Sequence, residues 1–240
     1  MAVNGEPSAD RLENMNTSTR QQKLTALCGL LGAAIVIAGC VATALPYAGE
    51  KGEAYSLLNH FISELGIVGV SKLAEVFNMS LIAAGLIIAV FMAGLGRHLQ
   101  TRLAHAAAVS GAGAGILCSM VGCVPMNDLV PHLWVAFSFF SCGLLTVGLF
   151  SHVIARDPEH KLPRWLVIPA LMTFGSFAAF LAYPVVTWQT PIEMIRVSQT
   201  ARPDIWAATI LEWLVLITVT TWIALVSVCL WARRDGRTQR

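Results

Sequence analysis

The sequence predicts an all-α polytopic membrane protein, with six transmembrane helices and a short amphipathic helix in the first loop. Of the 240 residues, 56% are hydrophobic and only 12% are charged, whereas a soluble domain is about 25% charged. The mean hydropathy is +0.66. Six apolar stretches are each long enough to cross a bilayer, which requires roughly 20 consecutive apolar residues. Little of the chain is left for a separate soluble domain.

These stretches predict one bundle over residues 23–234 with a polar tail at each end. Residues 1–22 contain mixed charges with several Ser, Thr and Asn, a composition typical of a mobile tail. Residues 235–240 form the second tail. The expected spans are residues 24–47, 73–95, 103–124, 132–155, 165–186 and 205–231.

The basic residues predict which side of the membrane each loop faces. Only Lys51, Lys72, Arg196 and Arg202 fall in the first, third and fifth loops, and the other 12 of the 16 Lys and Arg residues lie in the tails and the remaining loops. Basic residues accumulate on the cytoplasmic side of membrane proteins. The distribution therefore predicts a multi-pass protein of the cell (inner) membrane with both termini in the cytoplasm.

The start of the chain allows one alternative. The segment 36–40 resembles a lipoprotein cleavage box, and 42–44 resembles an ordinary signal cleavage site. The apolar run continues past both, to Tyr47. An uncleaved first span is therefore the preferred interpretation, and processing of the N-terminus stays open.

Charge and cysteine content argue against two classes of protein. The net charge of +2 comes without a basic patch, so a nucleic-acid partner is not expected. All six cysteines lie in apolar stretches, and none forms a Cys-x-x-Cys pair. A disulfide framework or a zinc knuckle is therefore not indicated.

The first loop carries a pattern typical of a short amphipathic helix. From Tyr55 to Gly66, apolar and polar residues alternate with helical spacing. The segment is too short to cross a bilayer, so we expect it to lie at the outer interface or to dip into the bundle. His60, Ser63 and Glu64 are three and four residues apart, which predicts that they share one face.

Further polar residues are expected near the same side of the membrane. Asp128 and His132 are four apart around the third loop, and Asn78 lies in the second span. Glu212 lies seven residues into the sixth span, on the order of 10 Å below its outer end at about 1.5 Å per residue. An ionised acid in the hydrocarbon costs roughly 2.5–3.5 kcal/mol. We therefore expect Glu212 to face inward with a proton or water, or to pair with a cation such as Arg196 or Arg202.

These positions together predict a polar pocket in the outer leaflet, although each residue alone has an ordinary structural explanation. Ionisable residues within membrane spans are by default candidates for function. The candidate ligand-binding residues are His60, Ser63, Glu64, Asn78, Asp128, His132 and Glu212. A sharper hypothesis makes His60, Asp128 and His132 zinc ligands, joined by Glu64 or Glu212. No residue is assigned a catalytic role.

Several short motifs resemble a known family. They are His60-Phe-Ile-Ser-Glu-Leu-Gly66, Val76-Phe77-Asn78, Ala83-Ala84-Gly85 and Gly122-Cys-Val-Pro125, with Asp128 and His132. The chain resembles the bacterial membrane family catalogued as domain of unknown function 998, over most of its length. That family is distantly similar to FRAG/DRAM/SFK-type membrane proteins, some of which are linked to lipid handling. The resemblance implies a six-span bundle in which His60, Ser63, Glu64, Asn78, Asp128 and His132 are motif positions, and it implies no reaction.

Three functions are compatible with these features, and whether the protein is an enzyme stays open. The leading hypothesis is that the pocket binds a membrane lipid headgroup or another small polar ligand. The second is a metal-assisted membrane hydrolase with a zinc-activated water. The third is an accessory subunit that binds other membrane subunits in a larger complex.

Overall fold

The computed structural model describes residues 9–193, 196 and 202–233, and these residues form helices and loops without β-strands. Six of the helices in these ranges are long and apolar enough to cross a membrane. They are α1 (Ala9–Ala44), α2 (Ala74–Leu99), α3 (Arg102–Cys123), α4 (Leu129–Arg156), α5 (Val167–Val186), which follows the short 3₁₀ helix η2 (Arg164–Leu166), and α7 (Ala207–Ala232). The predicted fold class is confirmed.

The first helix begins earlier than the sequence predicted. Residues from Ala9 to Gln22, assigned above to a mobile tail, continue the first span as helix. After Pro7 the chain has no Gly or Pro before Gly29, and it is rich in Arg, Leu, Glu, Met and Gln, which are good helix formers. Residues 1–8 of the first predicted tail, the last predicted bundle residue 234 and the second tail, 235–240, lie outside the described residues.

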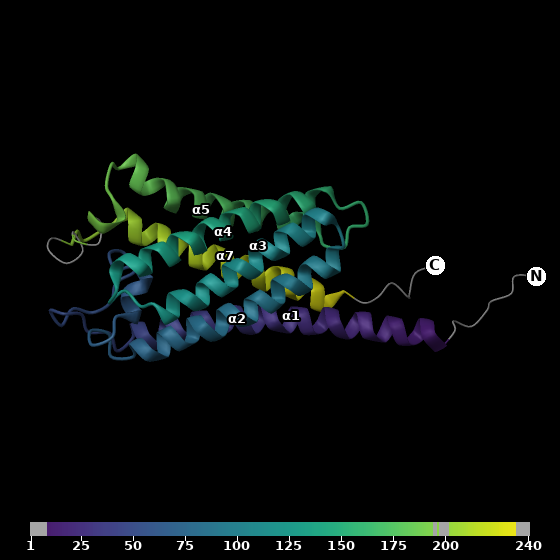
Figure 1. The fold of residues 1–240 in the computed structure, drawn as a ribbon, viewed down its shortest axis with the longest axis horizontal. Coiled ribbons are helices and arrows are strands. Elements are labelled where there is room, and N and C mark those ends of the chain that lie inside the picture. Colours follow the sequence, from purple (N-terminus) through teal and green to yellow (C-terminus); the bar gives the residue numbers. More distant parts are fainter. Residues whose placement is uncertain (1–8, 194–195, 197–201, 234–240) are drawn as a thin grey trace, which may run out of the picture.

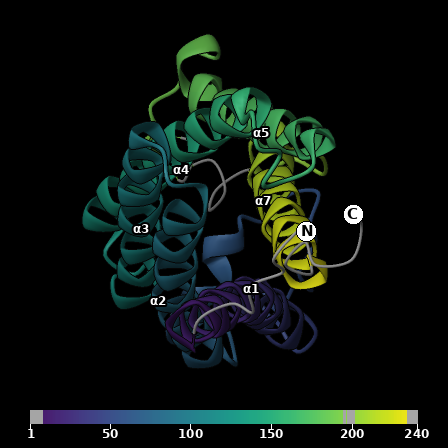
Figure 2. The same cartoon turned by 90° about the vertical axis from the view of Figure 1, so that its right-hand side faces the viewer.

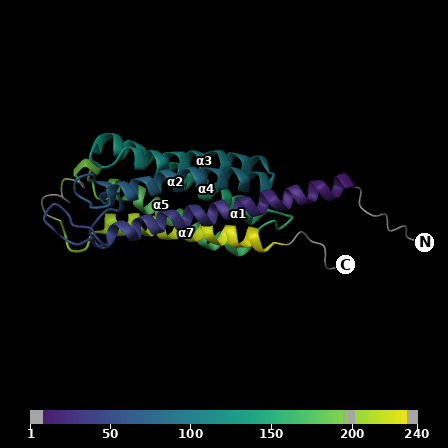
Figure 3. The same ribbon diagram turned by 90° about the horizontal axis from the view of Figure 1, so that it is seen from below.

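The membrane helices stand in a ring. Each packs against the next helix along the chain, and α7 packs against α1, which closes the ring. Figure 2 shows this ring end-on, and Figure 3 shows α1 beside α7. The start of α1 and the end of α7 lie at one end of the ring (Figure 1). The other end, called the distal end below, carries the connections 45–73 and 124–128 and the described residues 187–193 and 202–206 of the last connection.

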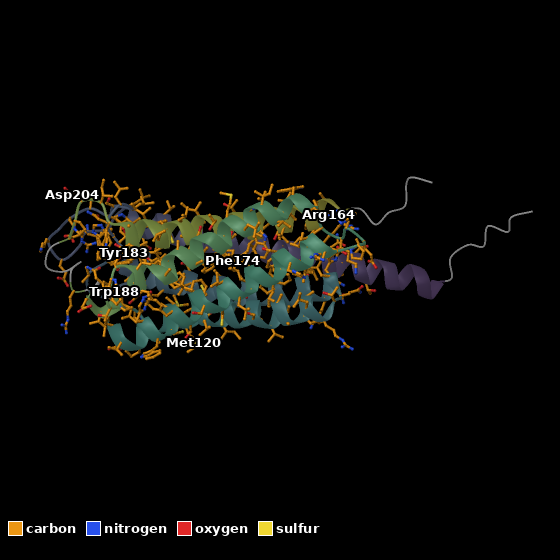
Figure 4. The ribbon with its side chains drawn as sticks, turned by 90° about the horizontal axis from the view of Figure 1, so that it is seen from above. Met120, Arg164, Phe174, Tyr183, Trp188 and Asp204 are labelled. Carbon is orange, nitrogen blue, oxygen red and sulfur yellow. The ribbon has the colours of Figure 1, made fainter. Side chains whose placement is uncertain are left out.

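Large side chains fill the half of the ring nearer the termini. Phe91, Leu95, Phe150, Phe177 and Trp222 are at most 1% exposed and belong to one apolar cluster. Figure 4 shows Phe174 and Met120 on the outer surface between Arg164 at one end and Trp188 and Asp204 at the other. Apolar residues thus cover both the inside and the outside of the ring, as expected where lipid surrounds the helices.

A close helix contact joins α2 to α3 through glycines. A Cβ atom added to Gly115 would lie 2.6 Å from the carbonyl oxygen of Gly85 and 2.8 Å from the backbone nitrogen of Ala89. A Cβ added to Gly85 would collide with the carbonyl oxygen of Gly115. Small residues at such positions let membrane helices approach closely. The two glycines therefore fix the spacing of α2 and α3.

This contact predicts opposite effects for two glycines of α3. Gly115→Ala must push α2 away and should cost about 1–3 kcal/mol of unfolding free energy. Gly113→Ala is the matched control, because a Cβ there meets nothing within 4 Å and alanine favours helix by about 1 kcal/mol over glycine. Thermal unfolding in detergent measures both. Equal melting temperatures for the two variants would contradict the close contact.

Candidate functional site

The first loop turns back into the ring. At its centre lies the 3₁₀ helix η1 (Ile62–Gly66), seen inside the ring of helices in Figure 2. Phe61 is 4% exposed and Leu65 is fully buried. The segment therefore dips into the bundle, but as a single 3₁₀ turn instead of the longer amphipathic helix predicted from Tyr55. Such non-helical backbone is tolerated inside a membrane bundle only where protein surrounds it.

Two carboxylates satisfy backbone N–H groups where the segment enters η1. Glu64 Oε1 accepts a hydrogen bond from the Phe61 N–H at 2.8 Å, and Glu212 Oε2 accepts one from the Ile62 N–H at 2.6 Å. The backbone at Phe61 is extended, with φ −66° and ψ 148°. The side chains thus provide acceptors that a longer α-helix would have provided from its own carbonyls. Glu212 faces inward, as predicted.

Arg202 forms a bidentate ion pair with Glu64. The Nη1–Oε1 and Nη2–Oε2 distances are 3.0 and 2.6 Å, and Nη1 also donates to the carbonyl oxygen of Asn59 at 2.6 Å. Burial acts to lower the pKa of Arg202, but the hydrogen bond and charge of Glu64 outweigh it and raise that pKa. Of the two cations expected for Glu212, Arg202 thus pairs with Glu64 instead, and the side chain of Arg196 is exposed.

Helix α7 and the loop before it hold the same segment by neutral hydrogen bonds. Trp213 Nε1 donates to the Tyr55 hydroxyl at 3.1 Å, which in turn donates to the carbonyl oxygen of Phe61 at 3.0 Å. Asn59 Nδ2 donates to the carbonyl oxygen of Pro203 at 3.1 Å. The bonds to Pro203 and Trp213 join side chains of the first loop to parts of the chain 144 and 158 residues away. The re-entrant segment, residues 55–66, is therefore fixed mainly by the last part of the chain.

His60 is buried beside the ion pair with one ring nitrogen unsatisfied. Its Nδ1 lies 2.8 Å from Asn59 Oδ1 and 3.3 Å from the Ser56 backbone nitrogen. Because Asn59 Nδ2 donates to Pro203, its Oδ1 is an acceptor, and this shorter contact assigns the proton to Nδ1 and a lone pair to Nε2. That Nε2 has no hydrogen-bond partner among the described residues and lies 4.0 Å from Glu53 Oε1. Burial lowers the pKa of His60. The imidazole is therefore a neutral acceptor near pH 7.

Two hollows lie on either side of η1. The inner cavity, about 90 Å³, is lined by Val36, Ile62, Ser63, Phe77, Leu81, Cys118, Val121, His132, Ala136, Phe139, Phe140, Glu212, Val215, Leu216 and Val219. The distal pocket, about 170 Å³, is lined by Tyr47, Glu50, Lys51, Glu53, Glu64, Ile67, Val70, Met126 and Arg202. Ser63 faces the inner cavity and Glu64 the distal pocket, so His60, Ser63 and Glu64 do not share one face. A 3₁₀ helix has three residues per turn, so the side chains of neighbouring residues such as Ser63 and Glu64 point about 120° apart.

Three of the predicted site residues line the inner cavity together: Ser63, His132 and Glu212. His132 is 4% exposed, and its Nδ1 lies 2.7 Å from the carbonyl oxygen of Val124. A carbonyl only accepts, so Nδ1 holds the proton and Nε2 is left as an acceptor. The cavity thus combines a hydroxyl, an imidazole and a carboxyl group from three separate elements.

The remaining predicted residues have other positions. Asn78 is buried, and its Nδ2 donates to the carbonyl oxygen of Gly66 at 3.0 Å, which supports the end of η1. A side chain at Gly66 would collide with Asn78, so this position requires glycine. Asp128 is exposed just before α4. It therefore lines neither hollow.

The predicted zinc ligands are not assembled. The described residues hold no group of three or more His, Cys, Asp or Glu side chains that could bind a metal ion. Asp128 is exposed while His60 and His132 are buried, and the Nδ1 atoms of the two histidines are engaged by Asn59 and Val124. The six cysteines are free thiols.

Sequence reasoning missed the aromatic and acidic side chains around His60. The rings of Tyr47 and Tyr55 pack on His60 with centroids 5.5 and 5.2 Å away, and Trp213 packs on Tyr55 at 6.0 Å. Tyr and Trp near span ends are typical of interfacial belts, so their positions alone gave no sign of an internal role. The signal that was present is Arg202, because it is a cation in a loop on the same side as Glu64.

The fold and the site define a polytopic membrane protein in which a ring of helices encloses a re-entrant segment. The chain belongs to the family described as "Protein of unknown function (DUF998)", whose model matches residues 30–229. The matched range includes every candidate residue named above. No curated protein matches the chain, and no solved structure matches it.

The ion pair predicts a large stability difference between two glutamates. Glu64→Ala leaves the charge of Arg202 without a counter-ion and the Phe61 N–H without an acceptor, and breaking a buried pair in this way should cost about 3–5 kcal/mol of unfolding free energy. The control is Glu159→Ala, which breaks the 3.1 Å pair with Lys161, where Glu159 is 69% exposed; exposed pairs contribute about 0–1 kcal/mol. Thermal unfolding compares them. Similar losses would show that the Glu64–Arg202 pair does not hold the segment.

Proposed function

We propose that this protein binds an amphiphilic lipid inside its ring of helices. The apolar part of the lipid enters the inner cavity, and its polar linking part contacts Ser63, His132 and Glu212. The observation that carries the proposal is the polarity gradient of the cavity lining, which has twelve apolar residues and only these three polar ones. Ligand sites are commonly mostly apolar hollows with a few placed polar groups.

The gradient runs along the axis of the ring. His132 lies in the first turn of α4 and Glu212 in the second turn of α7, both near the distal end. Phe139 and Val219 lie seven residues deeper on the same helices, which is about 10 Å at 1.5 Å per residue. An amphiphile whose chain points toward the termini and whose polar part points toward the distal end would place the chain beside Phe139 and Val219 and the polar part beside His132 and Glu212.

The three polar groups suit a hydroxyl, ester or amide group of a lipid. Ser63 supplies a hydroxyl donor, and His132 Nε2 and Glu212 supply acceptors. Burying a polar group without a hydrogen-bond partner costs about 1–3 kcal/mol. A lipid that offers complementary groups at this level is therefore favoured over a plain hydrocarbon.

The size of the inner cavity requires the ligand to extend beyond it. A cavity of about 150 Å³ accommodates benzene, so about 90 Å³ holds on the order of three to four carbons. The distal pocket offers room on the other side of η1. Where the two hollows approach each other, the Ser63 hydroxyl donates to Met126 Sδ at 3.4 Å. Sulfur is a weak acceptor, so this contact is the easiest one for a passing ligand to displace.

The positive-inside rule places the distal end on the outer face of the cell membrane. The start of α1 and the end of α7, which share the other end of the ring, would then face the cytoplasm. The lipid would enter from the outer leaflet, whose polar groups lie at the level of the distal pocket. A membrane lipid is accordingly the proposed partner.

Filling the inner cavity tests this function. Val219→Trp on α7 should reduce the phospholipid retained after detergent purification at least twofold, as counted by native mass spectrometry, because the indole occupies the space of the chain. Val228→Trp is the matched control, since Val228 is on the same helix but 52% exposed, and it should retain lipid like the wild type.

A second filling variant keeps the test decisive if Val219→Trp unfolds. Ala136→Leu narrows the same cavity from α4 with a smaller side chain. Thermal unfolding confirms that each variant is folded. Unchanged lipid retention in a folded cavity-filling variant would reject the proposal.

A further inference from the structure

We propose that the distal pocket binds an ammonium group, held between the carboxylate of Glu53 and the imidazole Nε2 of His60. The inference rests on the proposed function, because it names the headgroup chemistry of the same amphiphile. It concerns different residues from those of the inner cavity. The two proposals can therefore fail separately.

The charges around the distal pocket favour a cation. Its lining includes Glu50, Glu53 and Glu64 against Lys51 and Arg202. The Glu64–Arg202 ion pair neutralises two of these charges. The carboxylates of Glu50 and Glu53 then remain against the single ammonium of Lys51. The pocket therefore has a net negative charge, which attracts a positively charged ligand.

The unsatisfied nitrogen of His60 identifies a position within this field. His60 is 2% exposed and does not itself line the pocket, but its Nε2, which has no hydrogen-bond partner among the described residues, lies 4.0 Å from Oε1 of the lining residue Glu53. A donor group to one side of the line joining these two acceptors can lie within about 2.7–3.2 Å of each. An ammonium has three N–H donors and a positive charge. It therefore meets both the hydrogen-bonding and the charge requirement.

The aromatic lining favours the same ligand. Tyr47 is 6% exposed and lines the pocket, and a ring face attracts cations within about 6 Å of its centroid. Burial, helped by the charge of Glu64, raises the pKa of Tyr47. The side chain consequently stays a neutral phenol that can donate or accept a hydrogen bond.

A phosphate fits this pocket poorly. The guanidinium of Arg202 is already bonded to Glu64 and to the carbonyl oxygen of Asn59, which leaves Lys51 as the cation without such an ion pair in the lining. A phosphate would also face Glu50 and Glu53 at close range. The amine can belong to a lipid headgroup or to a free small amine, since both present the same chemistry.

Headgroup competition tests the inference. Delipidated wild-type protein is offered equal amounts of dioleoyl phosphatidylethanolamine and dioleoyl phosphatidylglycerol, and bound lipids are counted by native mass spectrometry. We expect at least a fivefold preference for phosphatidylethanolamine. Glu53→Gln should abolish the preference while total lipid stays unchanged, because Gln keeps an oxygen for the 2.9 Å hydrogen bond from the Lys51 N–H. Glu159→Gln, at the opposite end, is the control and should keep the preference.

A second arm separates the two sources of the amine. In phosphatidylglycerol nanodiscs, free ethanolamine is titrated while the ¹⁵N resonance of His60 Nε2 is followed. A saturable shift that Glu53→Gln removes identifies a free amine as sufficient, whereas a headgroup preference without this shift assigns the amine to the lipid. If Glu53→Gln does not fold, Glu50→Gln is the second variant, because the Glu50 side chain takes no part in the hydrogen bonds of the turn at 49–53, and it should weaken either response.

Absence of both responses overturns the inference. Equal binding of the two lipids, together with a lipid loss in Val219→Trp, would leave the proposed function intact and remove the amine site. Lipid binding that is insensitive to Val219→Trp but selective for phosphatidylethanolamine would remove the proposed inner-cavity function and leave the amine site intact.

Discussion

The rest of the structure depends on how the backbone N–H and C=O groups of the re-entrant segment find hydrogen-bond partners inside the ring of helices. Buried N–H and C=O groups without partners are costly, and lipid offers none. Glu64 and Glu212 accept the N–H groups of Phe61 and Ile62, and Arg202 and Tyr55 donate to nearby carbonyls. Glu64, in the re-entrant segment, and Glu212, in the last span, thus have a structural role, because they hold this segment in place.

The position of that segment creates the two hollows. Aromatic side chains such as Phe150, Phe177 and Trp222 fill the ring near the termini, and η1 fills part of the distal half. The inner cavity lies below η1 and the distal pocket above it, so Ser63 and Glu64, adjacent in sequence, face different chemical environments. A molecule with an apolar chain, a polar linker and a cationic headgroup matches this sequence of environments.

The sequence predicted the fold well and the site partly, for physical reasons. Long apolar runs determine spans almost by length alone, so the six spans found among the described residues agree with prediction to within about five residues. The inward position of Glu212 followed from the cost of burying its charge. The pairing of Arg202 with Glu64 did not follow, because the geometry of a 3₁₀ turn decides which carboxylate reaches it. Asp128 looked equivalent to His132 by spacing, but it lies just before α4, where the chain is exposed.

Amide hydrogen exchange in lipid nanodiscs, followed by NMR, tests the central claim most directly. The amides of Phe61 and Ile62 should exchange at least about 100-fold more slowly than that of Gly69, which lies in an exposed turn of the same connection. Exchange at the Gly69 rate would contradict the account, because the carboxylates of Glu64 and Glu212 would then not be bound to the re-entrant segment.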